Sequence, residues 1–416
     1  MKIFRINLYL SIANFFKTFF SQNVFTKEKI IKKILKKTNN KKFILLTSQC
    51  RVSFLLILNY LKKFNEKKNE IIICAYNLPE MVNIATNLNF KVIYCDINYE
   101  NGFFDINLLK KKITSKTSSV LLTNMFNNYD QSQKIKKLCK KKKIFLIEDN
   151  AIYFDNFSRK KNKRKYSGSL GDFSIYSFNI MKNISALYGG AVATNNKKFY
   201  DFASNEINQY DSFPGYLLLK QSFIFFILKL LSVKFLYKNI FFYIIKTAHL
   251  FRIKFLLVLF YPSLKFKKIE FPKFYFTKLT NFSKSLIYLQ LVNFKKRLEN
   301  QKIRKQNNIY YYKKFSNLNS KHVRIIKIKD FDFQNFIDFP VLVNKRDDLN
   351  KYLLENGIEA RVYYYKNCEK IFSKRKVRCK NANRYDQELI CFPNHKKICK
   401  DYIDYLTKKI LIFYKS

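Results

Sequence analysis

The chain has 416 residues, which leaves room for two or three domains and a sizeable hydrophobic core. Apolar residues make up 48% of it and aromatic residues 18%, which excludes a wholly disordered protein. The formal charge of +51 fits a partner such as nucleic acid or an anionic membrane. However, lysine, asparagine, isoleucine and phenylalanine are abundant while tryptophan is absent, a bias that AT-rich coding produces by itself. Charge alone therefore selects no partner, and we expect no specific nucleic-acid binding.

The first 40 residues are predicted to form an amphipathic N-terminal extension (1–40). It begins with a basic residue and continues as an apolar stretch that Lys17 interrupts. No small-residue cleavage site follows, so the pattern does not indicate a signal peptide.

Cysteine and histidine usage argues against a metal site. The 8 cysteines include no CxxC pair, and the 3 histidines are scattered, so we expect no zinc. Several cysteines lie in apolar runs, where a thiol behaves as a small hydrophobic group. This usage is typical of a reducing compartment, and we expect a cytoplasmic protein.

From residue 41 to residue 210, short apolar runs alternate with longer mixed segments. This alternation is typical of βαβ units, in which helices cover both faces of a mostly parallel sheet. We therefore predict an α/β domain of three layers at 41–210. Its seven expected strands are 43–47, 71–75, 92–95, 120–123, 145–147, 173–178 and 191–194.

The stretch 166–195 holds four of the 7 glycines of the chain, so we expect tight turns or close backbone approach here. Lys182 follows the expected strand 173–178, and Asp149 ends an earlier strand, where an acid faces the ligand crevice of an α/β sheet. Taken alone, Lys182 is equally one of many surface lysines. Taken together, the two residues suit pyridoxal phosphate (PLP), with the lysine bonding the cofactor and the aspartate its ring nitrogen.

Three sequence windows carry a family resemblance: LIEDNA at 146–151, GSLGDFSIYSFNIMKN at 168–183 and YGGAVATN at 188–195. In order and spacing they resemble the DegT/StrS family of PLP-dependent sugar aminotransferases. Less specific matches follow the same order at 96–114, 290–297, 356–365 and 389–395. The resemblance implies a fold-type-I PLP transferase, with the PLP-binding large domain at 41–210 and a smaller α+β C-terminal domain at 275–416.

The same resemblance implies the residues that hold the cofactor. Lys182 would carry PLP, Asp149 would pair with its pyridine nitrogen, and Ser177 would bond its phosphate. The turn at 48–51 would cradle that phosphate at a helix N-terminus, with Arg51 at a family position and Cys50 in place of the usual glycine. Ordinary helix capping explains this turn equally well. A cysteine is tolerable there only if the turn avoids positive φ.

Further assignments are less specific. Tyr76 is the expected ring-stacking aromatic, although Leu78 stays open as an alternative. Asn281 aligns with a residue that reaches the neighbouring subunit's cofactor phosphate, which implies a homodimer with shared active sites. Arg361 and His395 are candidate substrate-binding residues, and for Arg361 a solvated surface role is equally compatible with the sequence.

Between 211 and 274 lies a segment foreign to the family pattern. No acid occurs from residue 212 to residue 269, while ten cations alternate with apolar and aromatic runs. We predict a cationic, apolar helical insert (211–274) whose residues 216–265 contact an anionic membrane peripherally. A helical cap or a dimer surface with solvated lysines is the alternative. No uncharged run reaches the 18 to 20 residues of a spanning helix, so a transmembrane hairpin is disfavoured.

The function predicted from these observations is transfer of an amino group from an amino acid, with glutamate expected, to a keto sugar, with a nucleotide-activated one expected. Members that dehydrate carry histidine at the lysine position, so Lys182 disfavours that branch. Several family residues are replaced: Asn124 to Asn127 stand for His-x-Phe-Gly, and Ile152 stands for glutamine. The alternative is therefore a catalytically weakened, membrane-peripheral accessory or scaffold protein.

Overall fold

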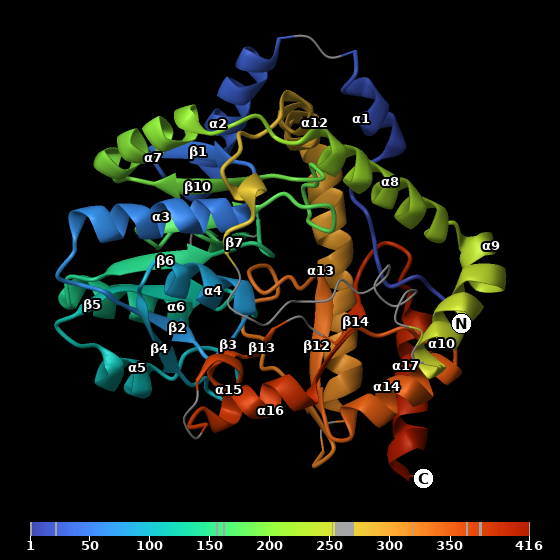
Figure 1. Cartoon of the computed structure of the whole chain (residues 1–416). Coiled ribbons are helices and arrows are strands. Elements are labelled where there is room, and N and C mark those ends of the chain that lie inside the picture. Colours follow the sequence, from blue (N-terminus) through green and yellow to red (C-terminus); the bar gives the residue numbers. More distant parts are fainter. Residues whose placement is uncertain are drawn as a thin grey trace.

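The computed structural model describes residues 2–20, 23–154, 157–160, 163–251, 253, 270–318, 320–362, 365–373 and 377–415. Its centre is a seven-stranded sheet of order β1-β10-β9-β6-β5-β2-β4 (Figure 1). Strands β9, β6, β5, β2 and β4 run parallel to one another, whereas β10 is antiparallel to both β1 and β9. The strands are β1 (Phe43–Thr47), β2 (Glu70–Cys74), β4 (Lys91–Cys95), β5 (Thr117–Thr123), β6 (Phe145–Asp149), β9 (Phe173–Ser177) and β10 (Gly190–Thr194). All seven predicted strands are present, and the mostly parallel α/β sheet is confirmed.

Successive residues of the central strands enter two different hydrophobic cores. On β2, Ile71 and Ile73 pack into one core, whereas Ile72 between them packs into the other. Strands covered on both faces read as continuous apolar runs, which is why they were visible in the sequence. The helices that accompany the sheet are α3 (Cys50–Phe64), α4 (Pro79–Asn87), α5 (Ile106–Lys112), α6 (Tyr129–Lys141) and α7 (Lys197–Gln209).

Two of the clustered glycines meet the backbone demands expected of them. Gly168 has a φ of +80°, and a Cβ at this residue would lie 2.0 Å from the hydroxyl oxygen of Tyr176. Gly190 opens β10 so close to the turn before α3 that its Cβ would lie 2.4 Å from the backbone nitrogen of Cys50. These glycines therefore let three chain segments converge at one end of the sheet.

The C-terminal part combines a long helical arm with a small sheet. Helices α12 (Asn281–Val292) and α13 (Phe294–Ser316) lead into the antiparallel sheet β11-β12-β14, formed by β11 (Val323–Ile325), β12 (Asp338–Val343) and β14 (Leu389–Pro393). A two-stranded ladder joins this part to the large sheet region, since β13 (Lys366–Asn367) pairs with β3 (Tyr76–Asn77). The remaining helices are α14 (Arg346–Glu355), α15 (Cys368–Phe372), α16 (Lys380–Glu388) and α17 (Lys400–Lys415). The predicted smaller α+β part is confirmed.

The insert is helical where the structure describes it. It contains α8 (Gly215–Leu231), α9 (Lys234–Leu236), the π-helix η1 (Tyr237–Phe241) and α10 (Phe242–Leu250), and the short helix η2 (Lys273–Tyr275) follows. In the described part of the chain no single helix is long and apolar enough to cross a membrane. The pair 215–231 and 234–250 passes that test jointly, by length and composition only, and is bent by 75°. Residues 252 and 254–269, which include the end of the predicted membrane-contacting segment, lie outside the described residues.

The N-terminal extension is more deeply embedded than its amphipathic pattern indicated. Residues 4–10 form no helix or strand and are packed inside the protein. They are followed by the helices α1 (Ile12–Lys17) and α2 (Val24–Asn39). Phe4, Ile6, Leu8 and Leu10 are all buried and share one core with the sheet and with α8. A second ladder, β7 (Phe157–Lys160) with β8 (Lys163–Tyr166), lies between β6 and β9 in the sequence.

Candidate functional site

Asp149 and Lys182 meet at one end of the central sheet. Asp149 is the last residue of β6 and is buried, and Lys182 lies in the turn that follows the adjacent strand β9. Burial raises the pKa of Asp149, against the opposing effects of a 3.0 Å hydrogen bond from the Ala151 amide and of the charge on Lys182. Burial likewise lowers the pKa of Lys182, and Asp149 is the strongest opposing charge. The two predicted catalytic residues are therefore electrostatic neighbours in a poorly solvated site.

The turn that carries Lys182 is fixed by its own backbone and by α12. The Lys182 amide donates to the Asn179 carbonyl at 2.9 Å, and the Ala186 amide donates back to the Phe178 carbonyl at 2.7 Å. From α12, the Ser283 hydroxyl donates to the Ala186 carbonyl at 2.9 Å. The Gln290 side chain from the same helix bonds both the amide and the carbonyl of Ser185. Lys182 thus projects from a rigid platform, as a positioned amine requires.

The turn between β1 and α3 has the features of an anion site. Ser48 and Gln49 are buried, and the Ser48 hydroxyl and the Gln49 side-chain nitrogen have no hydrogen-bond partner in the described structure. Gln49 is the N-cap of α3 and makes no side-chain capping bond. Unpaired buried donors at the start of a 15-residue helix suit a phosphate group, which the helix dipole also favours.

Cys50, which replaces the family glycine, fits this turn without strain. It starts α3 and is not among the described residues with positive φ, so its side chain is compatible with the backbone. Burial raises the pKa of the Cys50 thiol, and the nearby Asp149 raises it further. The thiol therefore stays protonated and acts as a small neutral wall of the site.

Arg51 and Ser177 lie at the same end of the sheet. The Arg51 guanidinium forms a 2.7 Å ion pair with Glu80 at the start of α4 and lies over the ring of Tyr275. The Arg51 side chain is thus already paired with protein groups. What Arg51 can contribute to an anion site is its position in the first turn of α3. Ser177 ends β9, is buried, and its hydroxyl accepts a 3.5 Å hydrogen bond from the Asn179 amide.

Tyr76 is directed toward the C-terminal part. Its buried ring lies 5.7 Å from Tyr385 and 6.1 Å from Tyr365, measured between ring centroids. Tyr365 was not predicted as a site residue, although it belongs to the quoted motif at 356–365. Burial raises the pKa of the Tyr365 hydroxyl, with Asp149 and Cys50 as the next contributions. The Tyr365 hydroxyl therefore lies within electrostatic range of Asp149, and the Tyr76 and Tyr365 rings are neighbours.

Arg361 is held next to the catalytic pair by an acid that the sequence analysis missed. Its guanidinium forms a 2.7 Å ion pair with Asp338, the first residue of β12, and its backbone bridges Cys391 on β14. Arg361 lowers the pKa of Lys182 and Asp338 raises it, which places both charges near the amine. The one signal for Asp338 in the sequence is an acid directly before the apolar run FPVLV at 339–343.

A recess beside Lys182 is lined from both ends of the chain. Met181, Asp338, Arg361 and His395 form one side, and residues 5–7 and 9 of the N-terminal segment form the other. His395 donates through Nε2 to the Phe4 carbonyl at 3.2 Å and accepts at Nδ1 from the Lys397 amide. Both of its ring nitrogens are thus occupied by backbone, so His395 holds the N-terminal segment against the recess. Nothing in the sequence indicated this contact.

The family of this chain follows from its similarity to known proteins. The sequence profile of the DegT/DnrJ/EryC1/StrS aminotransferase family matches residues 26–207 and 273–411. The chain belongs to this family. The first 25 residues and the insert residues 208–272 lie outside the match. The resemblance expected from the motifs is confirmed.

Individual curated relatives match this chain over shorter stretches than the family profile does. GDP-perosamine synthase of Escherichia coli O157:H7 is 31% identical over 133 residues, or 32% of this chain and 35% of that protein. UDP-4-amino-4,6-dideoxy-N-acetyl-beta-L-altrosamine transaminase of Helicobacter pylori is 24% identical over 178 residues, or 42% and 46%. The chain thus spans less than half the length of these curated relatives in each match.

Solved structures agree with the fold over the whole chain. Helicobacter pylori PseC, an aminotransferase involved in the biosynthesis of pseudoaminic acid, superposes with a TM-score of 0.71 at 15% identity and covers 100% of both chains. A GDP-4-keto-6-deoxymannose-3-dehydratase with a trapped PLP-glutamate geminal diamine gives 0.70 at 18% identity, over 98% of this chain and 99% of that one. The expected fold-type-I architecture is confirmed.

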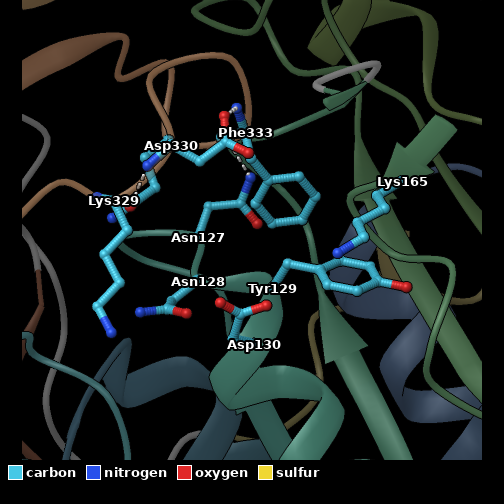
Figure 2. Close-up of a pocket in the computed structure, with 9 residues that line it drawn as sticks. Asn127, Asn128, Tyr129, Asp130, Lys165, Lys329, Asp330 and Phe333 are labelled. Atoms are coloured by element: carbon cyan, nitrogen blue, oxygen red, sulfur yellow. Dashed lines mark hydrogen bonds between the residues drawn. The ribbon is translucent and has the colours of Figure 1, made fainter. Parts of the chain in front are cut away.

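The structure accommodates one of the replaced family residues, Asn127. Asn127 takes the place of the family glycine with a φ of +48°, a region that asparagine tolerates better than most residues. Its side-chain nitrogen donates to the Phe333 carbonyl at 2.6 Å. Asn127 also lines a second recess at the start of α6, where Lys165 lies 4.6 Å from the centre of the Tyr129 ring (Figure 2). This recess shares no lining residue with the one beside Lys182.

Asn281 is the first residue of α12 and is exposed. The eight cysteines are all free thiols, and among the described residues no cluster of three or more His, Cys, Asp or Glu side chains suits a metal ion.

Proposed function

We propose that this family member is a PLP-dependent aminotransferase that moves an amino group from glutamate to the keto group of a nucleotide-activated sugar. The observation that carries the proposal is the placement of Lys182 and Asp149 at the carboxyl ends of adjacent parallel strands, within electrostatic range of each other. The named functions of the relatives support the substrate class, because GDP-perosamine synthase and the altrosamine transaminase both have nucleotide sugars in their names. The setting would be biosynthesis of a surface polysaccharide or glycolipid.

The residues present fit PLP. The unpaired Ser48 and Gln49 groups, the first turn of α3 and the Ser177 hydroxyl would hold its phosphate. Asp149 would face its pyridine nitrogen, and Lys182 would bind it covalently. When bound, the cofactor supplies an aldehyde carbon that bonds amines and a ring that withdraws electrons from the substrate carbon.

Asp149 and Lys182 would have different tasks in this scheme. The Asp149 carboxylate would hold a proton on the pyridine nitrogen, in a buried position without competing water. Besides holding the cofactor, Lys182 would act through its Nζ atom as the general base and acid that takes the proton from the substrate α-carbon and gives one back. Burial lowers the pKa of Lys182, so a larger fraction of the amine is neutral and able to accept that proton.

The choice between transamination and dehydration rests on the same side chain. Relatives at similar identity include GDP-4-keto-6-deoxy-D-mannose 3-dehydratase of Yersinia pseudotuberculosis, at 26% over 160 residues. The family resemblance assigns histidine to the lysine position in the dehydrating branch. Because position 182 is lysine, transamination is the reaction we propose.

The proposed partners follow from the same family reasoning and from the insert. A homodimer with shared sites would bring the exposed Asn281 to the partner's cofactor phosphate. Residues 216–265 would contact the inner face of the membrane while the protein remains cytoplasmic. The absence of acids from residue 212 to residue 269 supports this contact, because anionic lipid attracts such a segment. Deletion of 216–265 without loss of sedimentation with anionic liposomes would contradict it.

The proposal is tested first by the cofactor chromophore. Purified protein saturated with PLP should absorb visible light, and Lys182→Ala should lose the covalent component of that absorbance. Lys198→Ala is the matched control, since Lys198 is exposed at the start of α7. Absence of any bound chromophore in the wild type would sink the enzymatic proposal.

Turnover is tested with a panel of keto-sugar nucleotides and glutamate, with 2-oxoglutarate measured as product. We expect release of 2-oxoglutarate beyond one equivalent per active site only with a keto sugar present, together with an amino sugar. Release of ammonia and a deoxygenated sugar in place of the amino sugar would assign the protein to the dehydrating branch. A chromophore without either product would indicate the weakened accessory protein.

A further inference from the structure

The two chain segments outside the family match pack against each other. Phe15 on α1 stacks on Phe225 of α8 at 5.4 Å, and it meets Phe226 edge-on at 5.0 Å. The Lys229 ammonium of α8 donates to the Leu8 carbonyl at 3.1 Å. Figure 1 shows α1, α8, α9 and α10 following one side of the molecule in succession. Residues from the N-terminus and from the middle of the chain thus build one structural unit.

The outer side of this unit is unusually apolar. Helix α8 buries Phe225, Leu228 and Leu231, yet it also carries exposed apolar side chains at 216, 219, 223 and 230, which helical spacing places on one face. A helix that is apolar all round is normally covered all round. The exposed aromatic residues of the unit with the largest exposed fractions are Phe20 (86%), Phe251 (75%), Phe235 (71%), Tyr216 (69%), Phe223 (65%) and Phe19 (63%). Such a surface indicates contact with a partner.

The charges around this surface have one sign. Lys17, Lys220, Lys234 and Lys238 are exposed among the apolar side chains. The chain has no acid before Glu28, and none from residue 212 to residue 269. The surface therefore combines bulky apolar side chains with uncompensated cations.

This combination selects an anionic lipid surface over a second copy of the chain. In a symmetric dimer the same patch would face itself, so its lysines would oppose lysines with no acid in reach, which is unfavourable. At a bilayer interface, aromatic side chains enter the boundary between headgroups and acyl chains while lysines contact lipid phosphates. The 75° bend between the two helix arms also fits a unit that lies on a surface.

We propose that α1, α8, α9, η1 and α10 form one composite docking surface for an anionic membrane. The insert's membrane contact was already proposed above, and the new element is that α1, more than 200 positions earlier in the chain, supplies part of the same surface. The inference does not depend on the transaminase chemistry, so it can fail while that chemistry stands, and the reverse holds too.

The experiment compares exposed phenylalanines on and off the surface. Full-length protein is sedimented with phosphatidylcholine vesicles, with or without phosphatidylserine. The variants are Phe16→Ser on α1, Phe20→Ser next to it, Phe223→Ser on α8, and Phe64→Ser as control, because Phe64 is 59% exposed at the end of α3. We expect wild type and Phe64→Ser to sediment with anionic vesicles only, and the surface variants to bind about tenfold more weakly. Thermal unfolding and the PLP chromophore, measured on wild type and every variant, separate lost docking from lost folding or lost cofactor.

Three outcomes would overturn the inference. Unchanged sedimentation of both Phe20→Ser and Phe16→Ser, the latter 51% exposed on α1 itself, would remove α1 and the turn after it from the surface. Equal binding of wild type to neutral vesicles would remove the role of the lysines. A lipid-free wild type that is oligomeric and becomes monomeric in Phe20→Ser or Phe223→Ser would show that a second copy covers the patch.

Discussion

Arg5 and Glu359, separated by 354 positions in the sequence, form a 2.7 Å ion pair with side chains only 3% and 2% exposed. Glu359 also accepts a hydrogen bond from the Tyr237 hydroxyl of the insert at 2.9 Å. One carboxylate therefore ties together the N-terminal segment, the insert and the C-terminal part. The N-terminal wall of the recess beside Lys182 depends on this contact.

Removing one partner of the pair should be costly. We expect Arg5→Ala to lower the free energy of unfolding by about 3–5 kcal/mol, because it leaves the Glu359 charge buried. Lys197→Ala, which breaks an exposed ion pair with Asp201 on α7, should change it by less than about 1 kcal/mol. Urea unfolding followed by circular dichroism measures both. Equal effects would mean that the pair does not anchor the N-terminal segment.

Alanine substitutions should affect stability differently at a crowded glycine with positive φ, Gly168, and at a glycine with open space around it, Gly215. Gly168→Ala places a methyl group 2.0 Å from the Tyr176 hydroxyl at a φ of +80°, so we expect a loss of about 1–3 kcal/mol. Gly215→Ala, where nothing lies within 4 Å of the added Cβ at the start of α8, should be neutral or stabilising. The midpoints and slopes of urea unfolding curves give both values. A tolerated Gly168→Ala would show that the Lys182 region adjusts more freely than its packing indicates.

The hydrophobic pattern of the sequence was sufficient to predict the central sheet, but not the residues that line the recess beside Lys182. Strands such as β2 and β5 were predictable because both faces are buried and each contains a continuous apolar run, III in β2 and VLL in β5. Lys182 and Asp149 were predictable because Asp149 ends a strand and Lys182 lies in the turn after another. Asp338 could not be assigned, since its role comes from pairing with Arg361, which is 23 positions later in the sequence and meets the small sheet only through an isolated bridge to Cys391.

The contacts of the N-terminal segment with the recess could not be predicted from the sequence either. Segment 4–10 is bonded to residues more than 200 positions away, including Lys229, Glu359 and His395. No local period or motif reports such contacts. Arg5 is buried although it is charged, because Glu359 neutralises it.

His395 should make the protein acid-sensitive. Burial lowers the pKa of His395 to about 4, with Lys397 and Lys396 contributing in the same direction. In the unfolded chain histidine titrates near about 6.5. Between these values the unfolded state binds one more proton, so this contribution is fully present above pH 6.5 and is lost as the pH falls toward 4. The full loss amounts to about 3 kcal/mol.

The test is urea unfolding at pH 7, 6, 5 and 4.5. His395→Gln keeps a side-chain N–H for the Phe4 carbonyl but does not titrate, so its stability should fall less steeply with pH. His249 is also affected, because burial lowers the pKa of His249, and His249→Gln serves as the comparison. Identical slopes for wild type and His395→Gln would rule out His395 as the sensor.

Thiol reactivity should distinguish Cys50 from Cys399. Burial raises the pKa of Cys50, so few thiolates form in the active-site turn near neutral pH. Cys399 is exposed, whereas the other seven cysteines are buried or partly buried. Mass spectrometry after brief alkylation with iodoacetamide should find Cys399 modified first and Cys50 largely unmodified. Fast labelling of Cys50 would show that the turn before α3 is open to solvent.

Arg361 and Asp338 should control anion binding in opposite directions. Arg361→Ala removes the guanidinium and leaves a carboxylate beside Lys182, so we expect KM for an anionic substrate to rise by about tenfold or more. Asp338→Asn frees the guanidinium from its 2.7 Å partner, so KM for the same substrate should fall. Steady-state kinetics with glutamate and a keto-sugar nucleotide, varied separately, assign the effect to one of them. If both variants raise KM alike, the pair serves to join β12 to residue 361 and does not bind substrate.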